Sequence, residues 1–317
     1  MTLDVVVPTF NRQALLARLL DSIRAAHQPD RMRIRTIVVD NNSTDGTRDV
    51  VERAQRDWPG ILEYRFEPVQ SKSAALNNGL SAVTAEVVGL LDDDEEVDPQ
   101  WFEVTARMFE NPSVDFISGP YLPRWGAPQP SWLPKDEYPG VIGWLDVGDR
   151  VLEYGKNYDG VLMGGNAVVR AAAGKAVGWF NPSLGRVGVQ IGSGCEDVDF
   201  FERLQAIGAR GLYVPELIIY HYIPPRRLTK RYYREWCFRR FVAQAEADAL
   251  RPQPVKYVLG VPRYMIGKAF RSIPVMISSA LGRRWNDSRT FSRELAVWEL
   301  AGFLAGIVKR QSTTARA

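Results

Sequence analysis

Cysteine is scarce in this chain of 317 residues, which has only Cys195 and Cys237 and no CxxC pair. A disulfide framework or a structural zinc site is therefore not expected, and this composition favours a reducing cytoplasm. No GxGxxG turn follows the first apolar run, and the chain has no GxxxxGK[ST] loop and no GxSxG turn. These absences argue against P-loop nucleotide hydrolysis, ordinary dinucleotide chemistry and serine hydrolysis.

Long apolar runs are also missing. The two most apolar stretches of the C-terminal part, Ser272–Leu281 and Ala296–Val308, are shorter than the roughly 20 residues that a bilayer-spanning helix needs. The N-terminus has no basic segment before its first apolar run, so no secretory signal is expected. We predict a cytoplasmic protein, with peripheral association with the inner face of the membrane left open.

The charge is divided unevenly along the chain. Residues 226–317 carry 19 Lys and Arg against 6 Asp and Glu, whereas residues 1–225 carry 21 against 31. This division predicts an acidic catalytic part and a basic, helical, amphipathic extension that meets an anionic surface such as a membrane. Packing against the body or a dimer interface is the alternative. The chain has no nucleic-acid module, and no nucleic acid is expected as a partner.

Short apolar runs alternate with helical patterns in the first half of the chain. The expected strands are Leu3–Pro8, Arg35–Asp40, Ile61–Phe66 and Glu86–Leu91, and the expected helices are Arg12–Ala26, Gly46–Asp57 and Ser73–Val83. This rhythm predicts an α/β fold with a mainly parallel sheet flanked by helices. Ligands of such sheets bind beyond the carboxyl ends of the strands, where this sequence places the polar residues 9–11, 40–45 and 92–96.

An acidic cluster, Asp92–Glu96, directly follows the apolar run that ends at Leu91. Carboxylates this close repel one another unless a cation lies between them. Mg²⁺ and Mn²⁺ prefer oxygen ligands and often combine one or two carboxylates with substrate phosphates. The cluster therefore favours a metal site, and the alternative is a solvated turn that caps the next helix.

A second acidic group, Glu196, Asp197 and Asp199, follows the glycines of the segment 192–195 and precedes a helical pattern. Acids are common in the first turn of any helix, so capping is the simpler interpretation without further context. His221 follows the expected strand Leu217–Tyr220, where either a packing role or a metal or phosphate contact is open.

The middle of the chain holds six prolines between Pro120 and Pro139 and is expected to be a functional loop. The loop contains Tyr121, Trp125 and Trp132, and Trp144 follows it. We expect these aromatic side chains either to stack on sugar rings or to pack against the body.

Six segments resemble glycosyltransferase family 2, the large inverting family with the GT-A fold. They are VVVPTFNR (Val5–Arg12), VVDNNSTDGT (Val38–Thr47), SAALNNGL (Ser73–Leu80), LLDDDEEVDP (Leu90–Pro99), GGNAVVR (Gly164–Arg170) and GCEDVDFFERL (Gly194–Leu204). Their order and spacing follow those of the family. The resemblance implies a catalytic domain over residues 1–225, with a nucleotide-sugar half up to 119 and an acceptor half from 120.

The resemblance also implies roles for individual residues. Asp94 would be the main ligand of Mn²⁺ or Mg²⁺, with Asp92 nearby and His221 as a further contact, and Asp197 of the Glu196–Asp197 pair would be the general base. Lys72 is our candidate for the cation beside the diphosphate. The remaining donor-binding residues would be Pro8, Thr9, Asn11, Asp40, Asn41, Asp92 and Asp93.

Together these observations predict a metal-dependent hexosyltransferase. It would move a sugar from a UDP-sugar or another nucleotide sugar to a hydroxyl of a carbohydrate or lipid-linked acceptor, such as a cell-envelope polysaccharide precursor. Two alternatives stand beside it. One is a sugar-1-phosphate nucleotidyltransferase, which would release pyrophosphate, and the other is a non-catalytic carbohydrate-binding relative, which would need no general base.

Overall fold

The computed structural model describes residues 1–134, 138–184, 196–250, 253–281 and 287–314. Contacts between residues divide these into two compact units. The first, called the sheet unit, comprises the described residues of Met1–Arg124, Trp144–Val189 and Gly194–Tyr222. The second, called the helical unit, comprises those of Trp125–Gly143 and Ile223–Ala317. Each unit is described by itself below.

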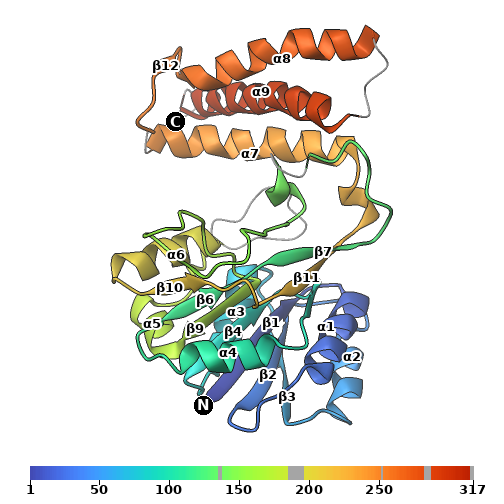
Figure 1. The fold of residues 1–317 in the computed structure, drawn as a ribbon, viewed down its shortest axis with the longest axis vertical. Helices are drawn as coiled ribbons and strands as arrows, with labels where there is room; N and C mark the ends of the chain where they lie inside the picture. Colours follow the sequence, from blue (N-terminus) through green and yellow to red (C-terminus); the bar gives the residue numbers. More distant parts are fainter. Residues whose placement is uncertain (135–137, 185–195, 251–252, 282–286, 315–317) are drawn as a thin grey trace. The chain divides into compact units, whose positions relative to one another are not determined.

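An eight-stranded sheet forms the centre of the sheet unit, in the order β3-β2-β1-β4-β9-β6-β10-β8 (Figure 1). Its strands are β1 (Thr2–Thr9), β2 (Arg33–Asp40), β3 (Ile61–Phe66), β4 (Val87–Leu91), β6 (Phe116–Ser118), β8 (Leu152–Glu153), β9 (Asn166–Arg170) and β10 (Gly211–Tyr213). The four strands from β3 to β4 run parallel, as the sequence predicts, because a helix returns the chain between successive strands.

Strand β9 reverses this direction. It pairs antiparallel with β4, so Asn166 at its start lies opposite Leu91 at the end of β4. The segment that precedes β9 therefore reaches the same edge of the sheet as the segment that follows β4. This arrangement brings distant parts of the sequence to one edge.

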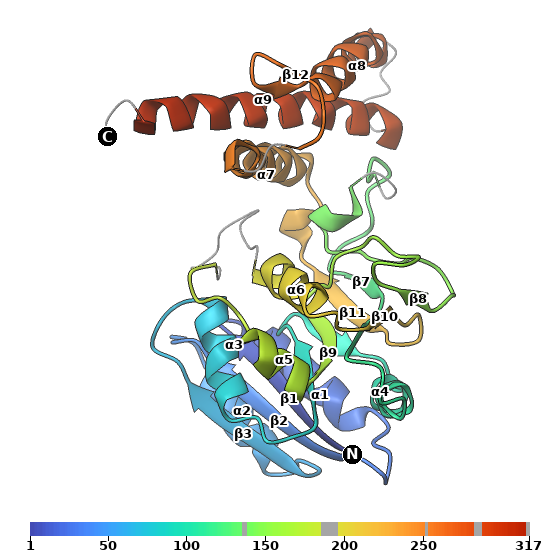
Figure 2. The same cartoon turned by 90° about the vertical axis from the view of Figure 1, so that its left-hand side faces the viewer.

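Helices cover both faces of the sheet, because its central strands are apolar on both sides (Figure 2). Side chains of α1, α2 and α4 pack in one apolar cluster, and those of α3, α5 and α6 pack in another. The helices are α1 (Gln13–Ala25), α2 (Thr47–Gln55), α3 (Lys72–Ser81), α4 (Trp101–Phe109), α5 (Ala171–Val177) and α6 (Glu196–Ala206). The predicted α/β class with a mainly parallel sheet is confirmed.

A second, three-stranded sheet has the order β5-β11-β7, formed by β5 (Glu95–Val97), β11 (Ile219–Ile223) and β7 (Tyr121–Trp125). The strand expected at Leu217–Tyr220 lies two residues later, so His221 is inside β11 and pairs with Glu95. The last two residues of the acidic segment, Glu95 and Glu96, thus belong to a β-strand. This strand, β5, forms because β11 supplies the backbone partners that an isolated turn would lack.

The helical unit contains α7 (Lys230–Leu250), the hairpin of β12 (Tyr257–Val258) and β13 (Val261–Pro262), α8 (Arg263–Leu281) and α9 (Ser288–Thr314). Helix α9 lies between α7 and α8 and packs against both (Figures 1 and 2). The ring of Trp132 packs edge-on against Phe291, with centroids 4.9 Å apart. None of the helices in the described ranges combines the length and apolarity needed to cross a bilayer.

Candidate active site

The acidic cluster lies where β4 leaves the main sheet and the chain enters β5. Asp93, Asp94 and Glu95 are almost completely buried, while Asp92 is partly exposed. Buried carboxylates are costly unless each has a charged or hydrogen-bonding partner. The partners of each acid therefore indicate what the cluster is built to hold.

Asp93 is held by two residues from the end of β1 and the turn after it. The Arg12 guanidinium lies 2.6 Å from Asp93 Oδ1, and the Thr9 hydroxyl donates to Asp93 Oδ2 at 2.8 Å. Burial raises the pKa of Asp93 to about 6, although the positive charge of Arg12 opposes this. Asp93 thus binds both Thr9 and Arg12, and these contacts tie the first strand to the fourth.

Asp94 lies between two basic side chains. Its Oδ2 is 3.0 Å from Arg12 Nη1 and 3.7 Å from His221 Nε2. Its backbone carbonyl accepts a hydrogen bond from Tyr222 in β11, which fixes the turn between β4 and β5. The structure therefore brings Asp94 and His221 together.

Asp92 and Glu95 form the other half of the cluster. Lys72, the first residue of α3, lies 2.7 Å from Asp92 Oδ1, and Glu95 Oε2 accepts the backbone N–H of Asp92. Burial raises the pKa of Glu95 well above its usual value, and the negative charges of Asp92 and Asp94 raise it further. The predicted cation Lys72 is thus beside the predicted carboxylate Asp92.

The loops after β1 and β2 are joined by hydrogen bonds. Asn11 adopts a left-handed backbone conformation, with φ of 51°, and its side chain accepts the N–H of Thr44. Asp40 accepts the N–H of Ser43 and the hydroxyl of Tyr64. These are the loops in which the donor-binding residues were predicted.

Two other predicted donor residues have structural partners. The Asn41 side-chain amide donates to Val69 O at 2.6 Å and its oxygen accepts the N–H of Ser71, so it holds the segment that leads into α3. Pro8 is buried inside β1 opposite Val39. Asp40 and Asn41 lie at the end of β2, beside the strand that carries Thr9.

The pair Glu196 and Asp197 begins α6, and residues 192–195 of the same motif lie outside the described residues. Glu196 is buried. A methyl group added at Gly164 would overlap the carboxylate of Asp197, and one added at Gly165 would overlap Glu95 and crowd Asp92. Two consecutive glycines before β9 therefore separate Asp197 from the acids of the β4–β5 turn.

Tyr121 lies beside the same glycine pair. Its hydroxyl donates to the carbonyl of Met163, the residue before the two glycines. Burial raises its pKa well above 10, and the charges of Glu95, Asp92 and Asp197 raise it further. Asp197 is thus close enough to the acidic cluster for both to act on one tyrosine.

The donor atoms fit a divalent cation that takes part of its coordination from a bound phosphate. Within the part of the chain that the structure describes, no three His, Cys, Asp or Glu side chains converge to form a complete protein cage. Mg²⁺-type sites commonly use only one or two carboxylates, with water and substrate oxygens as the other ligands. Asp92 and Asp94 are the candidates for such a pair, and in this structure Asp92 contacts Lys72 and Asp94 contacts Arg12.

The sequence-based prediction gave Arg12 no role, placed Glu95 in the acidic cluster without a partner, and gave Tyr121 a stacking or packing role rather than that of a buried hydrogen-bond donor. Arg12 is part of the first motif, and Glu95 is within the acidic run, so the sequence indicated that both belong to the site. It did not indicate which residues they contact. The sequence Gly164-Gly165 predicted that another group packs closely against the backbone there, and in the structure these groups are carboxylates.

Solved structures of similar fold include the mannosyltransferase PcManGT from Pyrobaculum calidifontis in complex with GDP-Man and Mn²⁺. The TM-score is 0.60 with 19% identity, over 96% of this chain and 86% of that one. At this identity the likeness shows the fold alone. The expected GT-A architecture is confirmed by such glycosyltransferase neighbours.

Two curated relatives are similar in sequence. The succinoglycan biosynthesis protein ExoM of Rhizobium meliloti is 28% identical over 73% of this chain and 72% of its own length. The GalNAc(5)-diNAcBac-PP-undecaprenol beta-1,3-glucosyltransferase of Campylobacter jejuni is 40% identical over 30% of each chain. The profile described as Glycosyl transferase family 2 matches residues 4–177, more than half of the sequence. The chain therefore belongs to glycosyltransferase family 2.

Proposed function

We propose that this glycosyltransferase moves a hexose from a nucleoside-diphosphate donor to an acceptor hydroxyl in a single displacement that inverts the anomeric carbon. One observation carries the proposal. Asp197 and the acids Asp92 and Glu95 lie against the consecutive glycines Gly164 and Gly165. A single displacement needs a base on one side of the sugar and, on the other, positive charge that offsets the leaving diphosphate. Asp197 would be the base, and the acids would hold the cation.

Asp94 and Asp92 would hold Mn²⁺ or Mg²⁺, with His221 as a further contact to the ion or the diphosphate. Bound there, the ion would offset the negative charge on the leaving diphosphate. Arg12 keeps the neighbouring Asp93 and Asp94 in place, since its guanidinium reaches both carboxylates. Lys72, beside Asp92, would add a positive charge to the diphosphate side of the site.

Asp197 would accept the proton of the attacking hydroxyl. Its Oδ1 is buried beside Gly164 and has no hydrogen-bond partner among the described residues, so no contact within them competes for a proton there. Glu196, buried next to it, would help to fix the first turn of α6. We infer that the backbone and side chains of the two tied loops, including Pro8, Thr9, Asn11, Asp40 and Asn41, form the wall against which the nucleoside binds.

The acceptor would be a carbohydrate or a lipid-linked sugar, such as a precursor of a cell-envelope polysaccharide. The names of the two relatives support this class, because one concerns succinoglycan biosynthesis and the other an undecaprenol-linked oligosaccharide. An acceptor of that kind would place the enzyme at the cytoplasmic surface of a membrane.

The test is incubation of the purified chain with a panel of nucleotide sugars, with Mn²⁺, with Mg²⁺ or with a chelator. We expect slow metal-stimulated release of a nucleoside diphosphate from one donor, faster with a suitable acceptor, and its loss in Asp94→Asn. Release of pyrophosphate from a sugar-1-phosphate and a nucleoside triphosphate would favour a nucleotidyltransferase instead. Carbohydrate binding without turnover of any donor would contradict catalysis.

A further inference from the structure

The helical unit contains a stretch of one charge sign. From Ala249 to Asn286 the sequence has no Asp or Glu, and it has seven Lys and Arg residues. Two acids border the stretch, Asp248 and Asp287. The described part of this stretch forms the β12–β13 hairpin and α8. A segment with several cations and no acids of its own is suited to an anionic partner.

The tip of the β12–β13 hairpin displays an aliphatic side chain. Leu259 is 96% exposed, and its neighbour Val258 is also exposed. Leu259 has φ of 50°, a left-handed conformation that a leucine side chain disfavours and that glycine or asparagine adopts more readily. An exposed leucine in this conformation is neither needed for the core nor suited to the turn.

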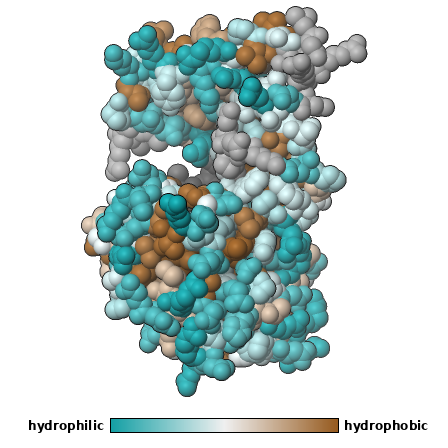
Figure 3. All heavy atoms as spheres, in the orientation of Figure 1, coloured by the Kyte–Doolittle hydropathy of each residue, from teal (hydrophilic) through white to brown (hydrophobic). Residues whose placement is uncertain are grey.

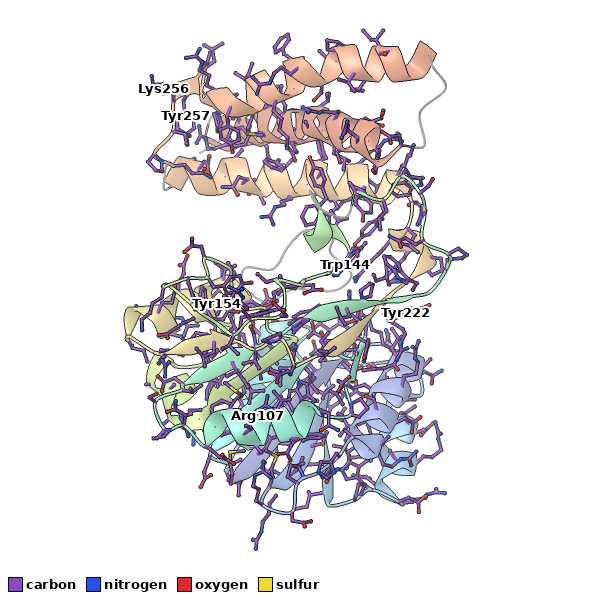
Figure 4. All side chains as sticks on the ribbon, viewed as in Figure 1. Arg107, Trp144, Tyr154, Tyr222, Lys256 and Tyr257 are labelled. Atoms are coloured by element: carbon purple, nitrogen blue, oxygen red, sulfur yellow. The ribbon has the colours of Figure 1, made fainter. Side chains whose placement is uncertain are left out.

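Hydrogen bonds hold the hairpin against the rest of the helical unit. The Tyr257 hydroxyl donates to Asp248 at the end of α7 and accepts the N–H of Gln253. The N–H of Arg263 donates to the carbonyl of Lys256, which joins the hairpin to α8. Figure 4 labels Lys256 and Tyr257 at this end of the unit. The exposed tip is therefore supported at its base.

Helix α8 directly follows the hairpin and also exposes apolar side chains. Phe270, Ile273 and Ile277 are exposed at 64%, 43% and 57%, and their spacing of three and four residues places them on one side of the helix. Met265 and Ala269, on the neighbouring side of α8, are buried in the unit. In Figure 3 apolar surface appears beside hydrophilic surface along the upper rim, where Figure 1 places α8.

Basic residues accompany this apolar stripe. Arg263 and Arg271 are exposed on α8, and Lys256 is exposed on the segment before β12. Lys268 is different, because it pairs with the buried Glu299 of α9. We call the combined surface the α8 face, and it consists of Lys256, Val258, Leu259, Arg263, Phe270, Arg271, Ile273 and Ile277.

We propose that the α8 face docks on an anionic lipid bilayer, with its aliphatic residues entering the headgroup region and its cations contacting lipid phosphates. Interfacial binding of this kind combines buried apolar area with attraction to negatively charged lipid. A second copy of the chain fits less well, because two identical faces would bring cation against cation. A single-stranded nucleic acid is bound by stacking on aromatic rings, whereas four of the five apolar residues of the α8 face are aliphatic.

This inference deepens the proposed function, since a lipid-linked acceptor is presented at such a surface, but the binding it describes rests on the helical unit alone. It is therefore tested without donor or acceptor. The full chain is sedimented with vesicles of phosphatidylcholine alone and with vesicles that also contain phosphatidylglycerol. We expect binding only to the anionic vesicles, and weaker binding as salt is added, because salt screens exposed charges.

Two variants remove the two components of the α8 face. Leu259→Asn combined with Phe270→Ser removes apolar residues at exposed positions, and asparagine suits the left-handed backbone at the tip. Arg263→Gln combined with Arg271→Gln removes two cations. We expect each double variant to bind anionic vesicles roughly tenfold or more weakly.

Matched controls lie in the sheet unit. Ile61→Ser removes an aliphatic residue that is 59% exposed, and Arg33→Gln removes an exposed cation. Both should bind vesicles as the unsubstituted chain does. Circular dichroism melting checks that all variants are folded, and light scattering records the oligomeric state.

Unchanged vesicle binding by both folded double variants would overturn the proposal, as would equal binding to neutral vesicles. A dimer that the double variants convert to monomer, without vesicle binding, would show that the face joins two copies. Donor hydrolysis separates this inference from the proposed function, because the double variants should retain it and Asp94→Asn should retain vesicle binding.

Discussion

The acidic turn of the sheet unit buries its charged side chains, whereas the basic α8 face of the helical unit exposes them. Asp93, Asp94 and Glu95 are buried and are met by partners from other strands and helices. The cations Arg263 and Arg271 are exposed beside exposed apolar residues. Burying a charge costs free energy and fixes the position of the side chain, which suits catalysis. An exposed charge costs little free energy and its side chain can move, which suits attachment to a surface.

The contrast predicts that substitutions in the sheet unit and in the helical unit have separable effects. Variants at the acids should change turnover, donor binding or both, and variants in the helical unit should change neither unless they unfold it. The following predictions test this separation, beginning with the largest effect.

Asp197→Asn should reduce the rate of transfer by about 10²- to 10⁴-fold, the usual contribution of a general base. Donor affinity should remain nearly unchanged, because the amide keeps the shape of the carboxylate. Steady-state kinetics and calorimetric titration of the donor with Mn²⁺ measure the two quantities. Glu202→Gln, on the exposed side of α6, is the control. Equal losses of rate and affinity would contradict the role of base.

Substitutions at Gly164 and at Gly165 should affect two different sides of the site. Gly165→Ala pushes a methyl group into Glu95 and Asp92, so metal-dependent donor binding should weaken by about 10- to 100-fold. Gly164→Ala pushes a methyl group into Asp197 instead, so turnover should fall more than donor affinity. The same titration and kinetics distinguish them. Identical behaviour of the two variants would show that the donor and acceptor sides are not separable in this way.

Asp4→Asn should lower the free energy of unfolding by about 3 kcal/mol at neutral pH, because Asp4 is a buried partner of Arg35. Burial alone would raise the pKa of Asp4, but hydrogen bonds from Arg35, Thr84 and Ala85 outweigh it and lower the pKa below 3.8. The stabilisation is therefore present above pH 3.8 and is lost as the pH falls through the lower folded-state pKa.

Denaturant titrations of Asp4→Asn over a range of pH measure this effect. The difference from the unsubstituted chain should shrink only below about pH 4. Asp21→Asn removes an exposed acid and should have an effect below about 0.5 kcal/mol. A difference that persists unchanged into strong acid would show that the charge of Asp4 is not its source.

Glu299→Gln should destabilise the helical unit by about 1–2 kcal/mol, since Glu299 is buried and contacts Lys268 and Tyr138. Donor affinity, a property of the sheet unit, should not change. Thermal melting and donor titration test the two parts. Glu246→Gln, which removes an exposed partner of Lys309, is the matched control. A parallel loss of donor affinity in Glu299→Gln would break the separation between the two regions.

Most of the main sheet is predictable because its signals are local. The strand at Ile61–Phe66 has the predicted bounds, and the other three parallel strands differ by one or two residues. Apolar β-branched runs and helical periodicity are readable within a short window. The three-stranded sheet is different, because β5 is a run of acids and valine that becomes a strand only through its pairing with β11.

The candidate site was predictable in its residues and not in their partners. The sequence places Asp92 to Glu95 after a strand, but it does not show that Arg12 reaches both Asp93 and Asp94. That contact joins residues about 80 positions apart. Burial of Glu95 likewise depends on Gly165, which only the three-dimensional fold brings near. The roles given to these residues in catalysis stay predictions.

Because β9 runs antiparallel to β4, a loop that precedes a strand reaches the same edge of the sheet as the loops that follow the parallel strands. Parallel strands deliver to the reactive edge only the loops that follow them, whereas β9, pairing Asn166 with Leu91, delivers the loop that precedes it. The chain thus reaches the edge from two independent stretches of sequence. The segment between β8 and β9, residues 154–165, belongs to none of β1, β2 and β4. A substitution at an exposed position of this segment therefore changes the edge without shifting the register of those three strands.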